Sequence, residues 1–188
     1  PYTTLFRSNP PRGTVFFDGE DIHDVPLDVL RGGVGYVPQD NFLFSASVRE
    51  NIRFYAPNVT DEDVYAAAKL ADIYDAVMDF PDGFDTEVGE RGVTLSGGQK
   101  QRVSIARALV KKPRVLILDD ALSAVDAETE RHIWASLRGV LSSGASGIVI
   151  AHRVSALMHC DEILVLDEGR VIERGTHEQL LALGGRYA

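Results

Sequence analysis

The sequence predicts an α/β fold in which helices cover both faces of a mostly parallel sheet. Continuous apolar runs such as Val115–Leu118 have the length of buried strands and alternate with helical patterns. The 188 residues are 45% hydrophobic and 25% charged, an ordinary balance for a globular protein with a substantial core. The sequence contains no internal repeat or low-complexity tract, so we expect one domain.

In the first half of the chain, alternating apolar residues mark strands and capping residues mark helix starts. Thr14–Asp18 and Val34–Val37 are predicted strands. Ser47–Phe54 and Thr60–Ala71 are predicted helices, the second opened by a capping threonine. Phe80–Val93 is rich in glycine, proline and charge and is predicted to be a loop.

The second half continues the alternation and ends in a hairpin and a helix. The predicted helices are Gly97–Lys111, Glu128–Leu141 and Thr176–Leu183. The predicted strands, the first two of them buried, are Arg114–Asp119, Gly147–Ala151, Ile163–Leu166 and Arg170–Glu173. Only three residues separate the last two strands, so we expect them to pair as a hairpin.

Charge, cysteine content and hydropathy narrow the class of protein. The formal net charge of −9 gives no basic surface for a nucleic-acid partner, and we expect none. Cys160 is the single cysteine, so no internal disulfide is possible, which fits a reducing compartment. No apolar stretch approaches the roughly 18–20 residues that a membrane helix needs. Any role at a membrane therefore requires another part of the protein or a partner.

Ser96, Gly97, Gly98 and Gln99 stand at the start of a predicted helix. A hydroxyl, unobstructed backbone N–H groups and the positive end of the helix dipole together suit phosphate oxygens. A capped helix start with glycines from the preceding loop explains the same residues about equally well.

Asp119 and Asp120 end a predicted buried strand. Such a pair suits a Mg²⁺ ligand followed by a base that activates water, although two aspartates that cap a turn are also common. His152 follows the next predicted strand and Gln39 follows an earlier one. Either residue alone is weak evidence, and Asp126 has the simple alternative of capping the helix that follows it.

The order and spacing of these residues match those of the ABC ATPase family, which the chain resembles from about Gly13 to Tyr187. The probability that all of these motifs agree with the family by chance is negligible. The resemblance implies ATP and Mg²⁺ as cofactors. It implies these roles: Gln39 in the Q-loop, Leu95–Gln99 as the signature motif, Asp119 as the Walker B metal ligand, Asp120 as the base, Asp126 in the D-loop and His152 as the switch histidine.

Two further stretches resemble the exporters of this family. They are Phe42–Ser45 with the following Asn51 and Ile52, and Thr86–Gly92, which resembles the exporter X-loop. By that resemblance Glu87, Glu90 and Arg91 contact transmembrane domains, although a solvated charged turn is the plain alternative. The resemblance implies an ATP-hydrolysing domain that powers export at the cytoplasmic face of the plasma or inner membrane. Its partners would be transmembrane domains and a second nucleotide-binding domain, identical or different.

The family's P-loop, GxxxxGK followed by serine or threonine, is not found in the sequence. The resemblance therefore implies a P-loop NTPase-like core without its P-loop strand and helix, which alone would be inactive and would expose apolar surface. Pro1–Ser8 resembles a translated sequencing adapter. We expect residues 9–188 to be a partial nucleotide-binding domain, with a helical subdomain over about 47–110.

Asp120 departs from the family, which usually has glutamate as the general base at this position. The shorter side chain reaches roughly 1.5 Å less, so we expect a poor base. This pattern resembles the degenerate half of heterodimeric multidrug exporters. The alternatives are a soluble ABC protein of translation or DNA repair, an importer ATPase and a non-catalytic nucleotide-binding partner. The stretch Thr86–Gly92 fits the first two less well, and the intact signature fits the third less well.

Overall fold

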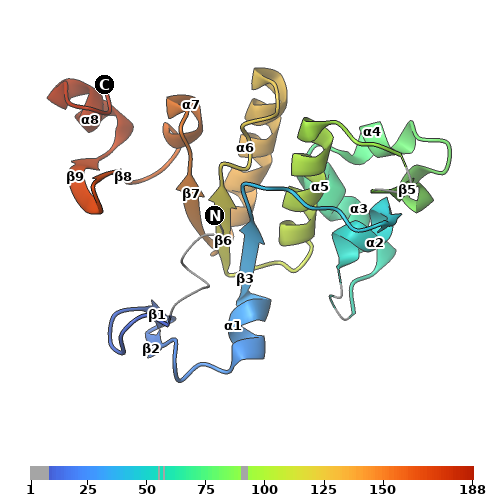
Figure 1. The fold of residues 1–188 in the computed structure, drawn as a ribbon, viewed down its shortest axis with the longest axis horizontal. Helices are drawn as coiled ribbons and strands as arrows, with labels where there is room; N and C mark the ends of the chain where they lie inside the picture. The colour runs from blue at the N-terminus through green and yellow to red at the C-terminus, as the bar shows by residue number, and fades with distance from the viewer. Residues whose placement is uncertain (1–8, 55, 57, 90–92) are drawn as a thin grey trace.

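The structure is a computed structural model and describes residues 9–54, 56, 58–89 and 93–188. Its centre is a parallel sheet of β3 (Val34–Val37), β6 (Val115–Asp119) and β7 (Ser146–Ile150), in that order (Figure 1). Val37 pairs with Leu118, and Asp119 pairs with Ile150. The carboxyl ends of the three strands therefore lie at one edge, and the predicted α/β fold with a mostly parallel central sheet is confirmed.

Helices α5 (Gly97–Leu109) and α6 (Ala127–Ser142) join this sheet in one core. Helix α5 packs on β3, where a Cβ at Gly35 would lie 2.8 Å from the Ala108 carbonyl oxygen. Glycine at this position thus permits the close approach of helix and strand. Helix α6 buries Ile133 and Leu137. Both helices follow their predicted segments to within two residues at each end.

A helical region lies beside α5 and consists of α2 (Val48–Arg53), α3 (Asp61–Leu70) and α4 (Tyr74–Met78) (Figure 1). Thr60 caps α3 in a capping box with Asp63, as its sequence predicts. The expectation of a plain loop over Phe80–Val93 was wrong. This segment contains the 3-10 helix η2 (Gly83–Asp85) and strand β5 (Glu87–Val88). Strand β5 pairs with β4 (Ala46–Ser47). Phe84 and Val88 of the segment are buried and join the core.

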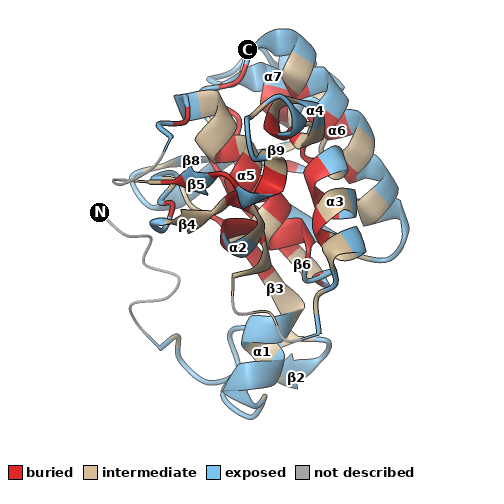
Figure 2. Ribbon diagram, turned by 90° about the vertical axis from the view of Figure 1, so that its right-hand side faces the viewer, coloured by how far each residue is buried: buried red, intermediate tan, exposed pale blue. Residues whose placement is uncertain are grey.

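The first described residues form a small antiparallel pair, β1 (Phe16–Phe17) and β2 (Glu20–Asp21), followed by α1 (Leu27–Gly33). The predicted strand over Thr14–Asp18 is thus only two residues long, because the chain turns back at Asp18 and Gly19, which both have positive φ. Figure 2 shows that β2 and α1 are largely exposed, whereas buried residues gather on α5, α2 and β6.

The last third of the chain adds the short helix α7 (Val154–Leu157) and a separate hairpin. Strands β8 (Ile163–Asp167) and β9 (Arg170–Gly175) are antiparallel, as predicted, and α8 (His177–Leu183) follows. Thr176 caps α8 in a capping box with Gln179. The hairpin and α8 lie at the opposite end of the molecule from α4 (Figure 1).

The expectation that the strand predicted at Gly147–Ala151 is buried was wrong. Within the part of the chain that the structure describes, strand β7 pairs only with β6, and it is mostly exposed, with Ile148 49% and Ile150 39% accessible. Strand β8 likewise exposes Leu164 and Leu166. Apolar composition predicted these strands, but burial depends on what packs against them. The expected exposure of apolar surface is confirmed.

Among the described residues, no helix has both the length and the apolarity needed to cross a membrane.

Candidate functional site

The sheet brings the ends of its three strands together, and with them four of the residues singled out by sequence. Asp119 is the last residue of β6 and Asp120 follows it. Gln39 lies two residues beyond β3, and His152 lies two residues beyond β7. The parallel pairing places all four at the same edge of the sheet.

Asp119 is the buried member of this group, with 7% of the residue accessible. Its Oδ2 accepts a hydrogen bond of 3.2 Å from the hydroxyl of Tyr36 on the neighbouring strand. Sequence reasoning missed Tyr36, although its place in a strand that ends at the same edge was a signal. The contact orients one oxygen of a carboxylate at the mouth of the site.

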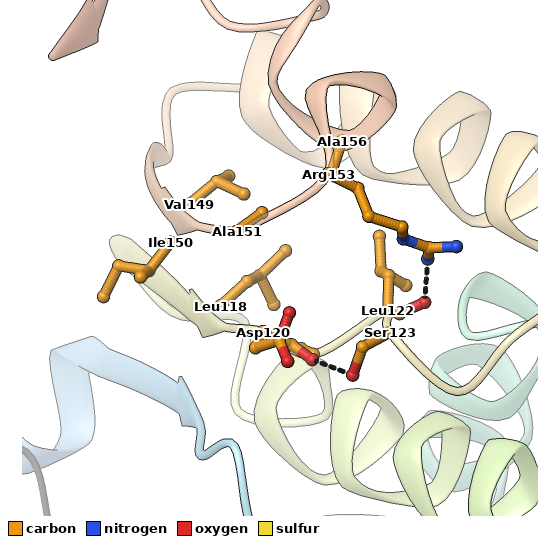
Figure 3. Close-up of a pocket in the computed structure, with 10 residues that line it drawn as sticks. Leu118, Asp120, Leu122, Ser123, Val149, Ile150, Ala151, Arg153 and Ala156 are labelled. Carbon is orange, nitrogen blue, oxygen red and sulfur yellow. Dashed lines mark hydrogen bonds between the residues drawn. The ribbon is translucent and has the colours of Figure 1, made fainter. Parts of the chain in front are cut away.

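Asp120 is half-buried and has a φ of 50°, in the left-handed region. Aspartate is one of the few residues that tolerate this conformation. Its N–H donates to the Ile150 carbonyl at 2.8 Å, and its carbonyl accepts from the Ser123 hydroxyl at 2.8 Å (Figure 3). The backbone that carries the Asp120 carboxylate is thus held on both sides of its Cα.

A small cavity of about 10 Å³ lies beside this turn. Asp120, Ser123 and Arg153 line it together with apolar residues of β6 and β7 (Figure 3). Its volume suits about one water molecule.

The signature residues form a helix cap. Ser96 Oγ accepts from the Gln99 N–H at 3.2 Å, and Gln99 Oε1 accepts from the Ser96 N–H at 2.9 Å. The capping role that the sequence left open is therefore present. The amides of Gly97 and Gly98 occupy the first helical positions, where an α-helix offers no carbonyl four residues earlier. These two amides are suited to an external acceptor.

The two signature glycines differ in their surroundings. A Cβ at Gly98 would lie 2.9 Å from the Ala124 carbonyl oxygen, a distance that real side chains avoid. A Cβ at Gly97 would lie 3.5 Å from the Ala124 Cβ, an ordinary contact. Gly98 is therefore required by packing against the turn after Asp120, whereas Gly97 is not.

Gln101 ties helix α5 to the same turn and is another residue that sequence reasoning missed. It is 4% accessible, and its Nε2 donates to the Asp120 carbonyl at 3.3 Å and to Ser123 Oγ at 3.1 Å. Its Oε1 accepts from the Ala124 N–H at 2.9 Å. A glutamine on the buried face of a predicted helix was the available signal. The start of α5 and the Asp120 turn thus form one connected unit.

Asp126 caps α6, which is the plain alternative that the sequence left open. Its side chain accepts from the N–H groups of Glu128 at 3.0 Å and Thr129 at 2.9 Å. The hydrogen bond from the Thr129 N–H is the main reason that the pKa of Asp126 is lowered from 3.8 to about 2. The carboxylate stays charged and fixed at the end of the turn that begins with Asp120.

The donors at the edge of the sheet fit Mg²⁺ chemically. Within the described ranges, no group of three or more histidine, cysteine, aspartate or glutamate side chains could hold a metal. Mg²⁺ usually takes one or two carboxylates and completes its shell with phosphate and water oxygens. Asp119 and the exposed Gln39, at the ends of adjacent strands, supply oxygen donors of that kind.

The residues expected to contact transmembrane domains are described only in part. Glu87 is exposed in β5, where it pairs with Ser47. Glu90 and Arg91 lie outside the described residues.

Comparisons with known proteins agree on one family. Residues 3–123 match the family described as ABC transporter. The chain is 51% identical over 185 residues to the ATP-binding cassette sub-family B member 6 of Xenopus tropicalis, covering 98% of this chain and 22% of that protein. It is 49% identical over 176 residues to the heavy metal tolerance protein of Schizosaccharomyces pombe, covering 93% of this chain and 21% of that protein.

A solved structure gives the same result. A bacterial Atm1-family ABC exporter with ATP bound matches with a TM-score of 0.84 and 47% identity, over 90% of this chain and 30% of that one. The chain therefore spans between a fifth and a third of the length of these relatives.

Proposed function

The chain belongs to the ABC transporter family, and on that basis we propose that residues 9–188 are part of the ATP-binding and ATP-hydrolysing domain of an exporter. One observation carries the proposal. Asp119, Asp120, Gln39 and His152 share one edge of the sheet, and the turn after Asp120 packs against the helix that Ser96–Gln99 opens.

Each of these residues has a role that its position supports. Asp119 and Gln39 would hold Mg²⁺, which neutralises charge on the phosphate oxygens of ATP. Asp120 orients the attacking water and accepts its proton. His152 stands at the same edge, where a ring N–H of its imidazole would donate a hydrogen bond to a phosphate oxygen. Asp126 ends the turn between Asp120 and α6.

Ser96, Gly97, Gly98 and Gln99 would bind the phosphates of an ATP held by a second nucleotide-binding domain. Their capping box fixes the start of α5, and the first amides of the helix point outward from its positive end. The partner domain, identical or different, completes the site. We place the helical subdomain at about 47–110 and the contact with transmembrane domains at Glu87, Glu90 and Arg91.

The short side chain of Asp120 favours a second, related role as the slow site of a heterodimer. In that case the signature of this chain serves the faster site of the partner. ATP at the Asp120 site stays bound for a long time because it is hydrolysed slowly. The whole protein would lie at the cytoplasmic face of a membrane, with its substrate set by other domains.

The test is Mg²⁺-dependent ATP hydrolysis by the intact protein that carries this cassette. Asp119→Asn removes the charge of the metal ligand and should lower the turnover at this site about 100-fold or more. Asp82→Asn, an exposed carboxylate in the turn before η2, is the control and should leave the rate unchanged. Equal turnover at this site in the wild type and Asp119→Asn would refute the proposed site.

A further inference from the structure

We propose that Arg153 is a positioning residue that, together with Glu130, holds the turn carrying Asp120 against the segment carrying His152. The inference deepens the proposed function, on which it rests, and it assigns a task to two residues that the sequence did not single out.

Arg153 contacts both sides of the site. It follows His152 directly, and its Nη2 donates to the carbonyl of Leu122, two residues after Asp120 (Figure 3). The same Nη2 lies 3.0 Å from Oε2 of Glu130 on α6. One guanidinium group therefore joins the segment after β7, the turn after β6 and helix α6.

Glu130, like Asp119, is a buried acidic residue, and its side chain is only 7% accessible. Its other oxygen accepts a hydrogen bond of 3.2 Å from the Ser155 hydroxyl. A buried carboxylate is tolerated only when charge and hydrogen bonds compensate for its lost hydration. Both compensating groups come from the segment just after His152, so α6 fixes that segment at two points.

The turn from Asp120 to Asp126 is held from two directions. On one side Gln101 binds the Asp120 carbonyl and the Ala124 N–H. On the other side Arg153 binds the Leu122 carbonyl between them. Without Arg153 the turn keeps its anchor on α5 but loses its anchor on the His152 segment. The relative placement of Asp120 and His152 then depends on the pairing of β6 with β7, on the hydrogen bond from the Asp120 N–H to the Ile150 carbonyl, and on the contact of Ser155 with Glu130.

Loss of the link made by Arg153 should affect the catalytic step and not the binding of ATP. Arg153 is not among the residues that we expect to touch ATP, so the KM for ATP should be nearly unchanged when the link is removed. A base displaced by about 1 Å loses on the order of 100-fold in rate, and a smaller displacement costs proportionately less. We expect kcat to fall about 10-fold or more when the link is removed.

Arg153→Met alone leaves the Glu130 carboxylate buried and unpaired, which threatens folding itself. The informative variant is therefore Glu130→Met/Arg153→Met, which removes both charges and keeps similar volumes. Glu130 is the buried member of this pair, whereas 43% of the Arg153 side chain is accessible. Replacement of a buried charge and its partner by apolar residues is often neutral for stability. The matched control is Glu162→Met/Arg174→Met, which removes an ion pair of 2.7 Å whose side chains are 50% and 68% accessible.

Both readouts use the intact protein that carries this cassette. Hydrogen exchange of backbone amides 121–126 needs no ATP and should be about 10-fold faster in the Glu130/Arg153 double variant than in the wild type. ATP hydrolysis should show the fall in kcat with KM within about twofold. The control should change neither quantity.

The outcomes separate the two proposals. A wild-type protein without ATPase activity would refute the proposed function, while the exchange rates would still test the link. Unchanged exchange of amides 121–126 in the double variant would overturn the positioning role. So would faster exchange accompanied by unchanged turnover at the Asp120 site.

Discussion

Asp120→Glu tests whether the length of this side chain limits hydrolysis. The backbone at this position is held by the hydrogen bonds to Ile150 and Ser123, so it cannot shift to compensate for a change of side chain. The added methylene therefore advances the carboxylate by roughly 1.5 Å. We expect turnover at this site to rise.

The size of the rise follows from the geometry required of a general base. A base must come within about 2.6–3.2 Å of the water it activates, and a misplacement near 1 Å costs on the order of 100-fold. That factor equals about 2.7 kcal/mol of activation free energy. An opposing effect acts on stability, because glutamate tolerates the φ of 50° less well than aspartate, by about 1 kcal/mol.

The assay is steady-state ATP hydrolysis by the intact protein, together with its thermal midpoint. Asp120→Glu should raise kcat by up to about 100-fold and lower the midpoint by a few degrees. Asp72→Glu is the matched control, because Asp72 has a φ of 55° outside the site and should show only the loss of stability. Unchanged turnover and occupancy in a folded Asp120→Glu protein would refute the argument from side-chain length.

Three further predictions concern packing and pH. Gly98→Ala should destabilise the fold by about 1–3 kcal/mol because its Cβ would overlap the Ala124 carbonyl, whereas Gly97→Ala should leave thermal stability nearly unchanged; equal midpoints would contradict this. Gly35→Ala should cost a similar amount in denaturant unfolding, because its Cβ would press on α5; a midpoint equal to that of the wild type would show that the helix can yield. The pKa of Asp126 is lowered from 3.8 to about 2, so its capping carboxylate stabilises the fold above about pH 4 and loses that effect as the pH falls toward 2. Asp126→Asn should therefore show a shallower loss of thermal stability over this range, and parallel curves would contradict the assignment.

Local chemistry explains what the sequence predicted well. Thr60, Ser96 and Thr176 each cap their own helix through side-chain contacts with residues three positions later, so the helix starts were predictable from a few neighbouring letters. The alternation of apolar strands and helices likewise predicted the parallel pairing that gathers Asp119 and His152 at one edge.

The features that the sequence missed depend on residues far apart in the chain. The contact of Tyr36 with Asp119 spans 83 positions and that of Arg153 with Leu122 spans 31. No local pattern encodes such pairs. The burial of β7 was misjudged for the same reason, because an apolar strand is buried only when other elements cover it. Strands of two residues, such as β5, are too short to produce a recognisable period.

The central claim is that ATP held by a partner domain lies against the start of α5. Ser96→Cys, in an intact protein with Cys160→Ser, can be treated with an ATP analogue that carries a thiol-reactive group on its γ-phosphate. Thr176→Cys is the control, because Thr176 caps α8 in the same kind of capping box. We predict labelling at position 96 that ATP with Mg²⁺ prevents, and none at position 176. Equal labelling at the two positions, or labelling that ATP does not prevent, would contradict the account.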